Sequence, residues 1–281
     1  MKDSNSLLIM AGGASSRMKR SLKKSAVADE IKKQAATVHK SLIPLGLSQH
    51  PLLYYLVKNA KAAGYKNIYL ITSPENEAFK SQLEQWKTDT LLNDIEILFA
   101  LQYLPKNREK PLGTADAVQQ TLEQHPELMQ TTFTVCNGDN LYSTKVLEML
   151  RTERMEPHAL ISYARSGLAF SDERISKFAV MDIDSEGHLK NIIEKPDLEQ
   201  VDQYKDGTGE IRVSMNIFSF DGKVFYPFLK QCPIHPERNE KELPEALRMM
   251  NKTLPKTTIC LPVHEHLPDL TSAEDILKFN G

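Results

Sequence analysis

The sequence predicts an α/β fold, in which a mostly parallel β-sheet carries helices on both faces and an α+β second half follows. Three observations support this prediction. Short apolar runs alternate with amphipathic stretches through the first half of the chain, and the connections between them are short. Strands joined by helices in this way pair in parallel. The length of 281 residues suits one large α/β domain or two small ones.

In the first half, short apolar runs predict buried strands at residues 7–10, 67–72, 95–100 and 133–136. Apolar side chains at helical spacing predict helices at 51–64, 75–86 and 114–124. Residues 19–39 are rich in lysine and polar side chains. A helix over residues 26–38 would have only a weak apolar face, so we expect a solvated flap there.

The pattern changes after residue 157. Strands are expected at 159–164, 213–220 and 257–263, and helices at 222–230, 243–251 and 272–279. Residues 177–183 and 189–194 flank Asp184-Ser185-Glu186-Gly187, a turn sequence that predicts a hairpin. No linker rich in Gly, Pro or Ser divides the chain, so we expect one continuous sheet and a single domain over residues 1–281.

Composition narrows the class of function. A formal net charge of -2 argues against bulk binding of nucleic acid, which usually requires a basic face. No apolar run approaches the ~18 residues of a membrane span, and the N-terminus lacks a signal peptide. The three cysteines, at 136, 232 and 260, have no metal-binding or disulfide spacing. We therefore expect a cytoplasmic protein without a membrane or nucleic-acid partner, and we expect Cys136 to be a buried core thiol.

Three loops at expected strand ends carry suitable chemistry for a ligand, because open parallel sheets bind ligands beyond the carboxyl ends of their strands. The loop 12–17 has two glycines and Arg17, and either cradles an anion or forms a tight turn. In the loop 102–114, Gly113 and Thr114 begin a helix whose N–H groups are expected to be free. In the loop 137–140, Asp139 is either a ligand for a hard metal or a helix N-cap.

These loops, together with Lys40, favour phosphoryl or nucleotidyl chemistry over other classes. The first loop is not a Walker A motif, because no Gly-Lys-Ser/Thr follows at the required spacing. It also lacks the third glycine of a dinucleotide fingerprint and the Gly-x-Ser-x-Gly elbow of a hydrolase.

Six motifs in order resemble the sugar-phosphate nucleotidylyltransferases, also called nucleoside-diphosphate-sugar pyrophosphorylases. The motifs are Met10–Met18, His39–Leu45, Pro111–Val118, Asn137–Asn140, Glu194-Lys195-Pro196 with Asn216 beyond it, and Asp269–Asp275. The resemblance implies a Rossmann-like, glycosyltransferase-A-like nucleotidyltransferase fold. It also implies a nucleotide-binding half over residues 1–157 and a sugar-binding half over residues 158–281.

The resemblance further implies that an NTP and a sugar 1-phosphate give an NDP-sugar and pyrophosphate, by Mg²⁺-assisted in-line attack on the α-phosphorus. The residues that match the family's functional positions are Arg17, Lys40 and Lys195 for catalysis, Ala11, Gly12, Gly13, Ser15, Ser16, Gln102, Gly113 and Thr114 for the nucleotide, Glu194 and Asn216 for the sugar, and Asp139 and Asp269 for the metal. Asp269 could instead cap the terminal helix, although Ser272 fits that role better.

Departures from the family pattern leave alternatives. Ala14-Ser15-Ser16 replaces the usual Gly-Thr, His39 stands where proline is usual, and residues 19–39 are longer than usual. We expect residues 19–39 to form a basic lid over the triphosphate, so that deleting residues 23–36 raises the KM for the nucleotide.

Two rival functions remain. They are a cytidylyltransferase for phosphocholine or an inositol phosphate, and an inactive regulatory relative. The base, the sugar and the oligomeric state are open, a homo-oligomer among the options.

Overall fold

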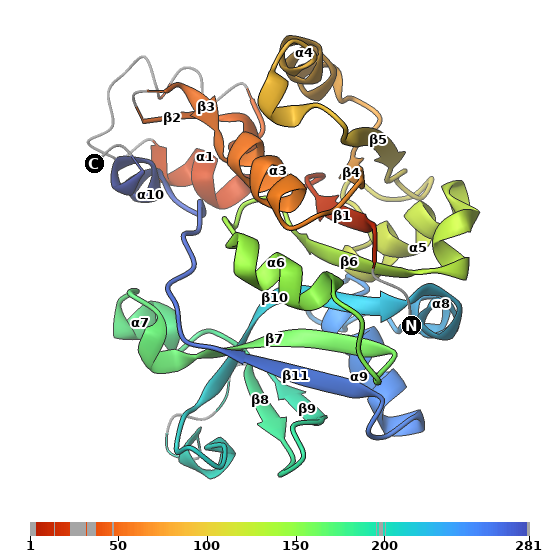
Figure 1. The fold of residues 1–281 in the computed structure, drawn as a ribbon, viewed down its shortest axis with the longest axis vertical. Coiled ribbons are helices and arrows are strands. Elements are labelled where there is room, and N and C mark those ends of the chain that lie inside the picture. The colour runs from red at the N-terminus through yellow and green to blue at the C-terminus, as the bar shows by residue number, and fades with distance from the viewer. Residues whose placement is uncertain are drawn as a thin grey trace.

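The computed structural model describes residues 4–13, 15–22, 32, 38–46, 48–194, 196, 199 and 201–279. Within these residues, nine strands form one sheet (Figure 1). They are β1 (Ser6–Met10), β4 (Asn67–Thr72), β5 (Glu96–Leu101), β6 (Thr132–Asn137), β7 (His158–Ala164), β8 (Val180–Ile183), β9 (Leu189–Ile193), β10 (Arg212–Asp221) and β11 (Thr258–Val263). The short strands β2 (Pro44–Leu45) and β3 (His50–Pro51) pair separately.

The strand order is β11-β7-β10-β6-β1-β4-β5, and β8 and β9 form a ribbon that leaves the sheet at β10. Strands β5, β4, β1 and β6 are parallel, as their helical connections predict. Strand β10 runs antiparallel to both β6 and β7, whereas β11 is parallel to β7. The predicted mixed, mostly parallel sheet is therefore confirmed, and its strands come from both halves of the chain.

Helices cover both faces of the sheet (Figure 1). They are α1 (Ser16–Leu22), α3 (Leu52–Ala62), α4 (Glu77–Trp86), α5 (Thr114–Gln124), α6 (Thr144–Arg151), α7 (Asp172–Ile175), α8 (Gly222–Gln231), α9 (Leu243–Thr253) and α10 (Ala273–Lys278). Side chains of a strand alternate between faces. Leu7 and Ile9 of β1 accordingly join the core beneath α3 and α6, and Leu8 joins the core beneath α5, α8 and α9.

The first helix differs from the sequence prediction. Residues 19–22 were expected in a solvated segment, but they belong to α1. The reason is that Met18 and Leu22 are buried in a third core cluster with Leu270 and Ile276. The expected flap over residues 26–38, and with it the lid hypothesis, lies almost entirely outside the described residues. Helix α7 has only four residues and is absent from the sequence prediction.

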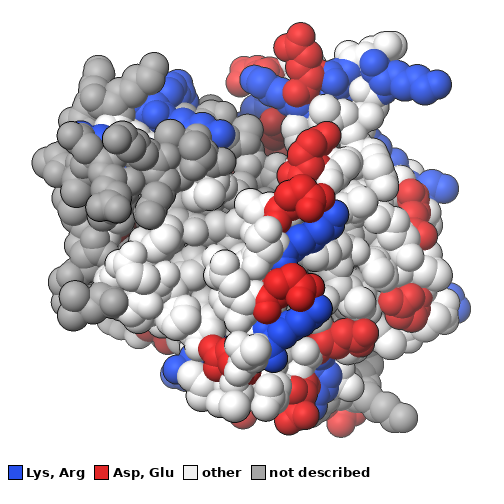
Figure 2. All heavy atoms as spheres, turned by 90° about the horizontal axis from the view of Figure 1, so that it is seen from above, with Lys and Arg blue, Asp and Glu red and all other residues white. Residues whose placement is uncertain are grey.

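The surface, the lengths of the helices and Cys136 each add a finding. Figure 2 shows a face on which acidic and basic side chains lie interspersed. Within the described part of the chain, no helix has both the length and the apolar character that crossing a membrane requires. Cys136 on β6 is fully buried, as predicted, and burial raises the pKa of its thiol well above the ordinary value.

Candidate functional site

The candidate site lies at the carboxyl ends of the parallel strands, where two adjoining cavities form one cleft. The first cavity has a volume of about 310 Å³ and the second about 420 Å³. Gly12, Gly13, Gln102 and Pro111 line both. Since these residues come from the loops after β1 and β5, two of the three loops singled out in the sequence do meet at this edge of the sheet.

The glycine loop is held against the end of β4. The N–H of Ala11 donates to the carbonyl of Ile71 at 2.8 Å. Ser15 has a φ of 53°, and its hydroxyl accepts the backbone N–H of Lys40 at 3.2 Å. Ser16 and Arg17 lie in the first turn of α1, and Ala14 lies outside the described residues. The first loop therefore holds Lys40 next to His39, which lines the second cavity.

Gln102 is buried at the cleft wall and its amide is already engaged. The Nε2 group donates to the carbonyl of Gly113 and to the Asp116 carboxylate, both at 2.9 Å. Both amide hydrogens are thus used, so the side chain can offer only its carbonyl oxygen to a bound base.

The N-terminus of α5 is less open than the sequence predicts. The N–H of Ala115 donates to the carbonyl of Lys241 at 3.0 Å, and the Thr114 hydroxyl accepts the N–H of Leu243 at 2.9 Å. The expectation that the N–H groups after Gly113 are free is therefore wrong for Ala115, because a segment from the second half of the chain packs over the helix start. Gly113 itself has a φ of 115°, and a Cβ there would lie 2.3 Å from the Lys241 carbonyl.

The loop after β6 carries Asp139 to the same edge. The N–H of Gly138 donates to the carbonyl of Met10 at 2.9 Å, so this loop and the glycine loop touch. The Lys40 ammonium forms an ion pair with the Asp139 carboxylate. Ser143, and not Asp139, caps α6 by accepting the N–H of Val146. The N-cap alternative for Asp139 is therefore excluded, and its carboxylate pairs with Lys40 instead.

Asp269 lies beside Asp139. The N–H of Leu270 donates to the carbonyl of Asp139 at 2.8 Å, and Asp269 pairs with Asn140 in an isolated β-bridge. Burial, followed by the charge of Asp139, raises the pKa of the Asp269 carboxyl. Asp275, rather than Asp269, accepts the N–H groups of Thr271 and Ser272 at the start of α10. Asp269 is therefore no helix cap.

Arg174, a basic residue from the second half of the chain, forms an ion pair with the Asp269 carboxylate. Arg174 of α7 lies 2.5 Å from Asp269 and 2.9 Å from Asp275, and its guanidinium sits 4.4 Å from the centroid of the Phe170 ring. Two converging carboxylates, each now balanced by a basic side chain, offer the oxygen donors that Mg²⁺ prefers. The donor set of Asp139 and Asp269 thus fits a divalent metal.

His39, beside Lys40, contributes no charge at neutral pH. Burial, followed by the charge of Lys40, lowers the pKa of its imidazole to about 4. The ring lines the second cavity and lies 5.5 Å from the ring of Phe79, centroid to centroid.

The residues predicted for a sugar lie on the second half. Asn216 has a φ of 55° within an irregularity of β10, and the hydroxyl of the buried Tyr142 donates to the carbonyls of Met215 at 2.7 Å and Asn216 at 3.3 Å. Because Tyr142 follows the Asp139 loop directly, it ties Asn216 to that loop. Glu194 is exposed and lies 3.3 Å from Arg238. Lys195 is outside the described residues.

A model of the nucleotidyl transferase family matches residues 33–259. The chain belongs to the nucleotidyl transferase family. It is 30% identical over 202 residues to a chloroplastic/amyloplastic glucose-1-phosphate adenylyltransferase small subunit of Triticum aestivum, across 69% of this chain. It spans only 38% of the length of that curated relative. A solved structure of UDP-glucose pyrophosphorylase complexed with UDP-glucose has a TM-score of 0.70 at 17% identity, covering 98% of this chain and 96% of that one.

The nucleotidyl transferase model covers Lys40 and Asp139 but neither the glycine loop nor Asp269. The placement of those two segments in the site rests on the contacts described above. Sequence reasoning missed Arg174, Lys241 and Tyr142, which act on the site through other residues. No local pattern marks them, since each meets its partner through a long-range contact.

Proposed function

We propose that this nucleotidyl transferase joins an NTP to a sugar 1-phosphate, giving an NDP-sugar and pyrophosphate. The observation that carries the proposal is the convergence of Lys40, Asp139 and Asp269 beside the glycine-lined cleft. A phosphate oxygen of the sugar 1-phosphate forms a new bond to the α-phosphorus of the NTP as the bond to pyrophosphate breaks. Two anions must meet in line, so the protein's task is positioning and neutralisation of charge.

The first half, residues 1–157, is proposed to hold the NTP. Gly12 and Gly13 leave room for phosphates close to the backbone, and Arg17 is proposed to bind the triphosphate from the first turn of α1. The Gln102 carbonyl oxygen is proposed to accept a hydrogen bond from the base, and Gly113 and Thr114 line the same cavity. The Lys40 ammonium, now paired with Asp139, would turn to the phosphates when they arrive.

Asp139 and Asp269 are the residues that would hold Mg²⁺. When bound, the metal supplies charge neutralisation at the phosphoryl oxygens. With Asp139 holding the metal, the Lys40 ammonium would be free to pair with a phosphate, because a carboxylate shared with a divalent cation attracts a lysine less. Arg174 would keep Asp269 ionised and oriented.

The second half, residues 158–281, is proposed to hold the sugar 1-phosphate. Asn216 is the exposed residue at the irregularity of β10, where its amide is accessible for hydrogen bonds to hydroxyl groups. Glu194 would bind a further hydroxyl and Lys195 the sugar phosphate. The names of the relatives point to glucose 1-phosphate as the first sugar to test.

The test is release of pyrophosphate across a panel of NTPs and sugar 1-phosphates with Mg²⁺. We expect turnover with at least one pair, and Asp139→Asn should lower kcat by at least about 100-fold. Asp202→Asn, at an exposed carboxylate that pairs with Lys205, is the matched control and should keep normal turnover. Turnover only with CTP and phosphocholine or an inositol phosphate would favour the rival enzyme class. Normal turnover in Asp139→Asn would refute the metal assignment.

A further inference from the structure

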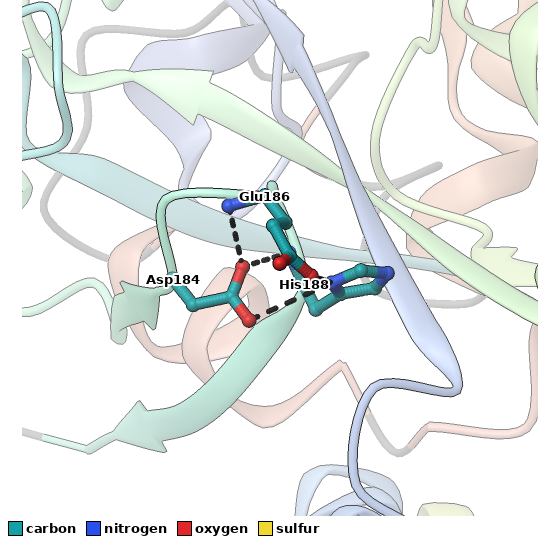
Figure 3. A group of neighbouring side chains, drawn as sticks. All are labelled: Asp184, Glu186 and His188. Carbon is teal, nitrogen blue, oxygen red and sulfur yellow. Dashed lines mark hydrogen bonds and ion pairs between the residues drawn. The ribbon is translucent and has the colours of Figure 1, made fainter.

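We propose that the hairpin between β8 and β9 holds a Zn²⁺ ion through Asp184, Glu186 and His188. Figure 3 shows the three side chains turned toward one another across the hairpin. Their ligand atoms all lie within 4.8 Å of one another. The ribbon of β8 and β9 lies at the bottom of the view in Figure 1. None of the three side chains lines either cavity of the nucleotide cleft, so this site is separate from it.

The carboxylate of Asp184 divides its two oxygens between the turn and the proposed metal. Its Oδ1 accepts the N–H groups of Glu186 at 2.9 Å and His188 at 2.8 Å. These bonds fix the turn and hold the carboxylate in place. The other oxygen, Oδ2, faces the His188 ring with 3.5 Å between it and Nδ1.

The second observation concerns His188 itself. Its Nδ1 atom is buried and makes no hydrogen bond to any described residue, although carboxylate oxygens of Asp184 and Glu186 lie 3.5 Å and 3.6 Å away. These separations are too long for hydrogen bonds. Zinc bonds of about 2.0–2.1 Å place tetrahedral ligand atoms about 3.3–3.4 Å apart. A buried nitrogen that faces two carboxylates at nearly this spacing suits a tetrahedral cation between them.

The surroundings of the second ring nitrogen, Nε2, also suit a histidine that binds a metal. His188 Nε2 lies 3.6 Å from the Glu156 carboxylate. When Nδ1 binds a metal, the ring proton must sit on Nε2, and metal-binding histidines commonly direct that proton toward a carboxylate. The backbone is rigid here, since the N–H of Cys260 in β11 donates to the Gly187 carbonyl at 2.8 Å.

Lys256 would compete with the metal ion for the Glu186 carboxylate. Its ammonium lies 2.9 Å from Glu186 Oε2, and both side chains are 60% exposed. Such a surface ion pair contributes little free energy. A divalent cation would therefore displace the ammonium at small cost, and removing the lysine should strengthen zinc binding.

The experiment is calorimetric titration of the metal-free, full-length protein with Zn²⁺, at saturating Mg²⁺ to occupy other carboxylates. We expect the wild type to bind one more Zn²⁺ than His188→Gln and Asp184→Asn. The asparagine can still accept the two turn N–H groups, so it separates loss of the ligand from loss of the turn. Lys256→Gln should bind Zn²⁺ several-fold more tightly, and Glu156→Gln about 10-fold more weakly. Co²⁺ bound in place of Zn²⁺ should give the visible absorption of a tetrahedral complex.

Equal zinc stoichiometry and affinity in the wild type, His188→Gln and Asp184→Asn would overturn the proposal, as would wild-type binding weaker than about 1 mM. Thermal unfolding in chelator should show all variants folded. Pyrophosphate release with Mg²⁺ should be the same in His188→Gln as in the wild type, so the outcome here is independent of the proposed catalytic function.

Discussion

Adjacent glycines at the cleft should respond differently to the same added methyl group. A Cβ at Gly12 would meet the backbone of Ile71, Thr72 and Ser73 at 3.6–3.7 Å, which is ordinary contact with β4 and the residue after it. A Cβ at Gly13 would meet no described atom within 4 Å. Gly13, like Gly12, lines both cavities. We therefore expect the methyl of Gly13→Ala to enter the space proposed for the nucleotide, whereas that of Gly12→Ala packs on the protein.

The magnitude follows from these contacts. Neither substitution demands strain, because neither glycine has a positive φ, so the free energy of unfolding should change by less than about 1 kcal/mol. If the methyl of Gly13→Ala prevents one backbone N–H from reaching a charged phosphate, about 1.5–3 kcal/mol of binding is lost. That corresponds to a rise in the KM for the NTP of about 10- to 150-fold.

The assay is pyrophosphate release at varied NTP concentration for the two variants and the wild type, with urea unfolding as the check on stability. Gly12→Ala should raise the KM much less than Gly13→Ala. Equal KM values in the two variants, with both stably folded, would refute the reasoning about which methyl faces the ligand.

Three further substitutions test other parts of the structure. Gly113→Ala should lower the free energy of unfolding by at least about 2 kcal/mol, since it places a Cβ 2.3 Å from the Lys241 carbonyl at a φ of 115°; urea unfolding measures it, and a loss under about 0.5 kcal/mol would contradict the close approach. Burial, followed by the charge of Arg154, lowers the pKa of His158 to about 3. As the pH falls from about 6.5 toward 3, the unfolded chain gains a proton that the folded chain does not, so stability falls by up to about 1.4 kcal/mol per pH unit. His158→Asn can still accept the N–H of Asp221 and should flatten the dependence of stability on pH across this window; an unchanged slope would show that His158 is not its source. Ile276→Ala should loosen α10 from α1 by about 2 kcal/mol, because Ile276 is fully buried there, and should expose the tail to limited proteolysis; a tail as resistant as that of the wild type would show that α10 does not depend on this contact.

The sheet was predictable because its strands are short buried runs whose ends carry clear signals. The strand Asn67–Thr72 and the helix Thr114–Gln124 match the predicted ranges, since apolar periodicity marks both and Gly113 precedes the helix. The antiparallel insertion of β10 between β6 and β7 was not predictable. An apolar run of that kind shows that a strand is buried, but it does not tell which strands it joins.

Candidate site residues were predicted where a motif names a residue type, whereas residues that meet the site only through a long-range contact carry no such signal. Asp139 stands out as a carboxylate after a buried strand. The carbonyl of Lys241 binds the start of α5 across a long loop, and any residue type could supply that carbonyl. Arg174 is an ordinary basic residue in a short helix until the fold brings Asp269 and Asp275 to it.

Contacts between the two ends of the chain support the tail that follows Asp269. The N–H of Ala273 donates to the Ser21 hydroxyl at 2.9 Å, and Met18 and Leu22 of α1 pack with Leu270 and Ile276. Helix α1 begins directly beyond the glycine loop, so the contacts that hold the tail also hold the proposed triphosphate loop. A disturbance of α10 should therefore weaken the proposed binding of metal and nucleotide together, whereas the irregularity at Asn216, which is held by Tyr142 and proposed to bind the sugar, should respond less.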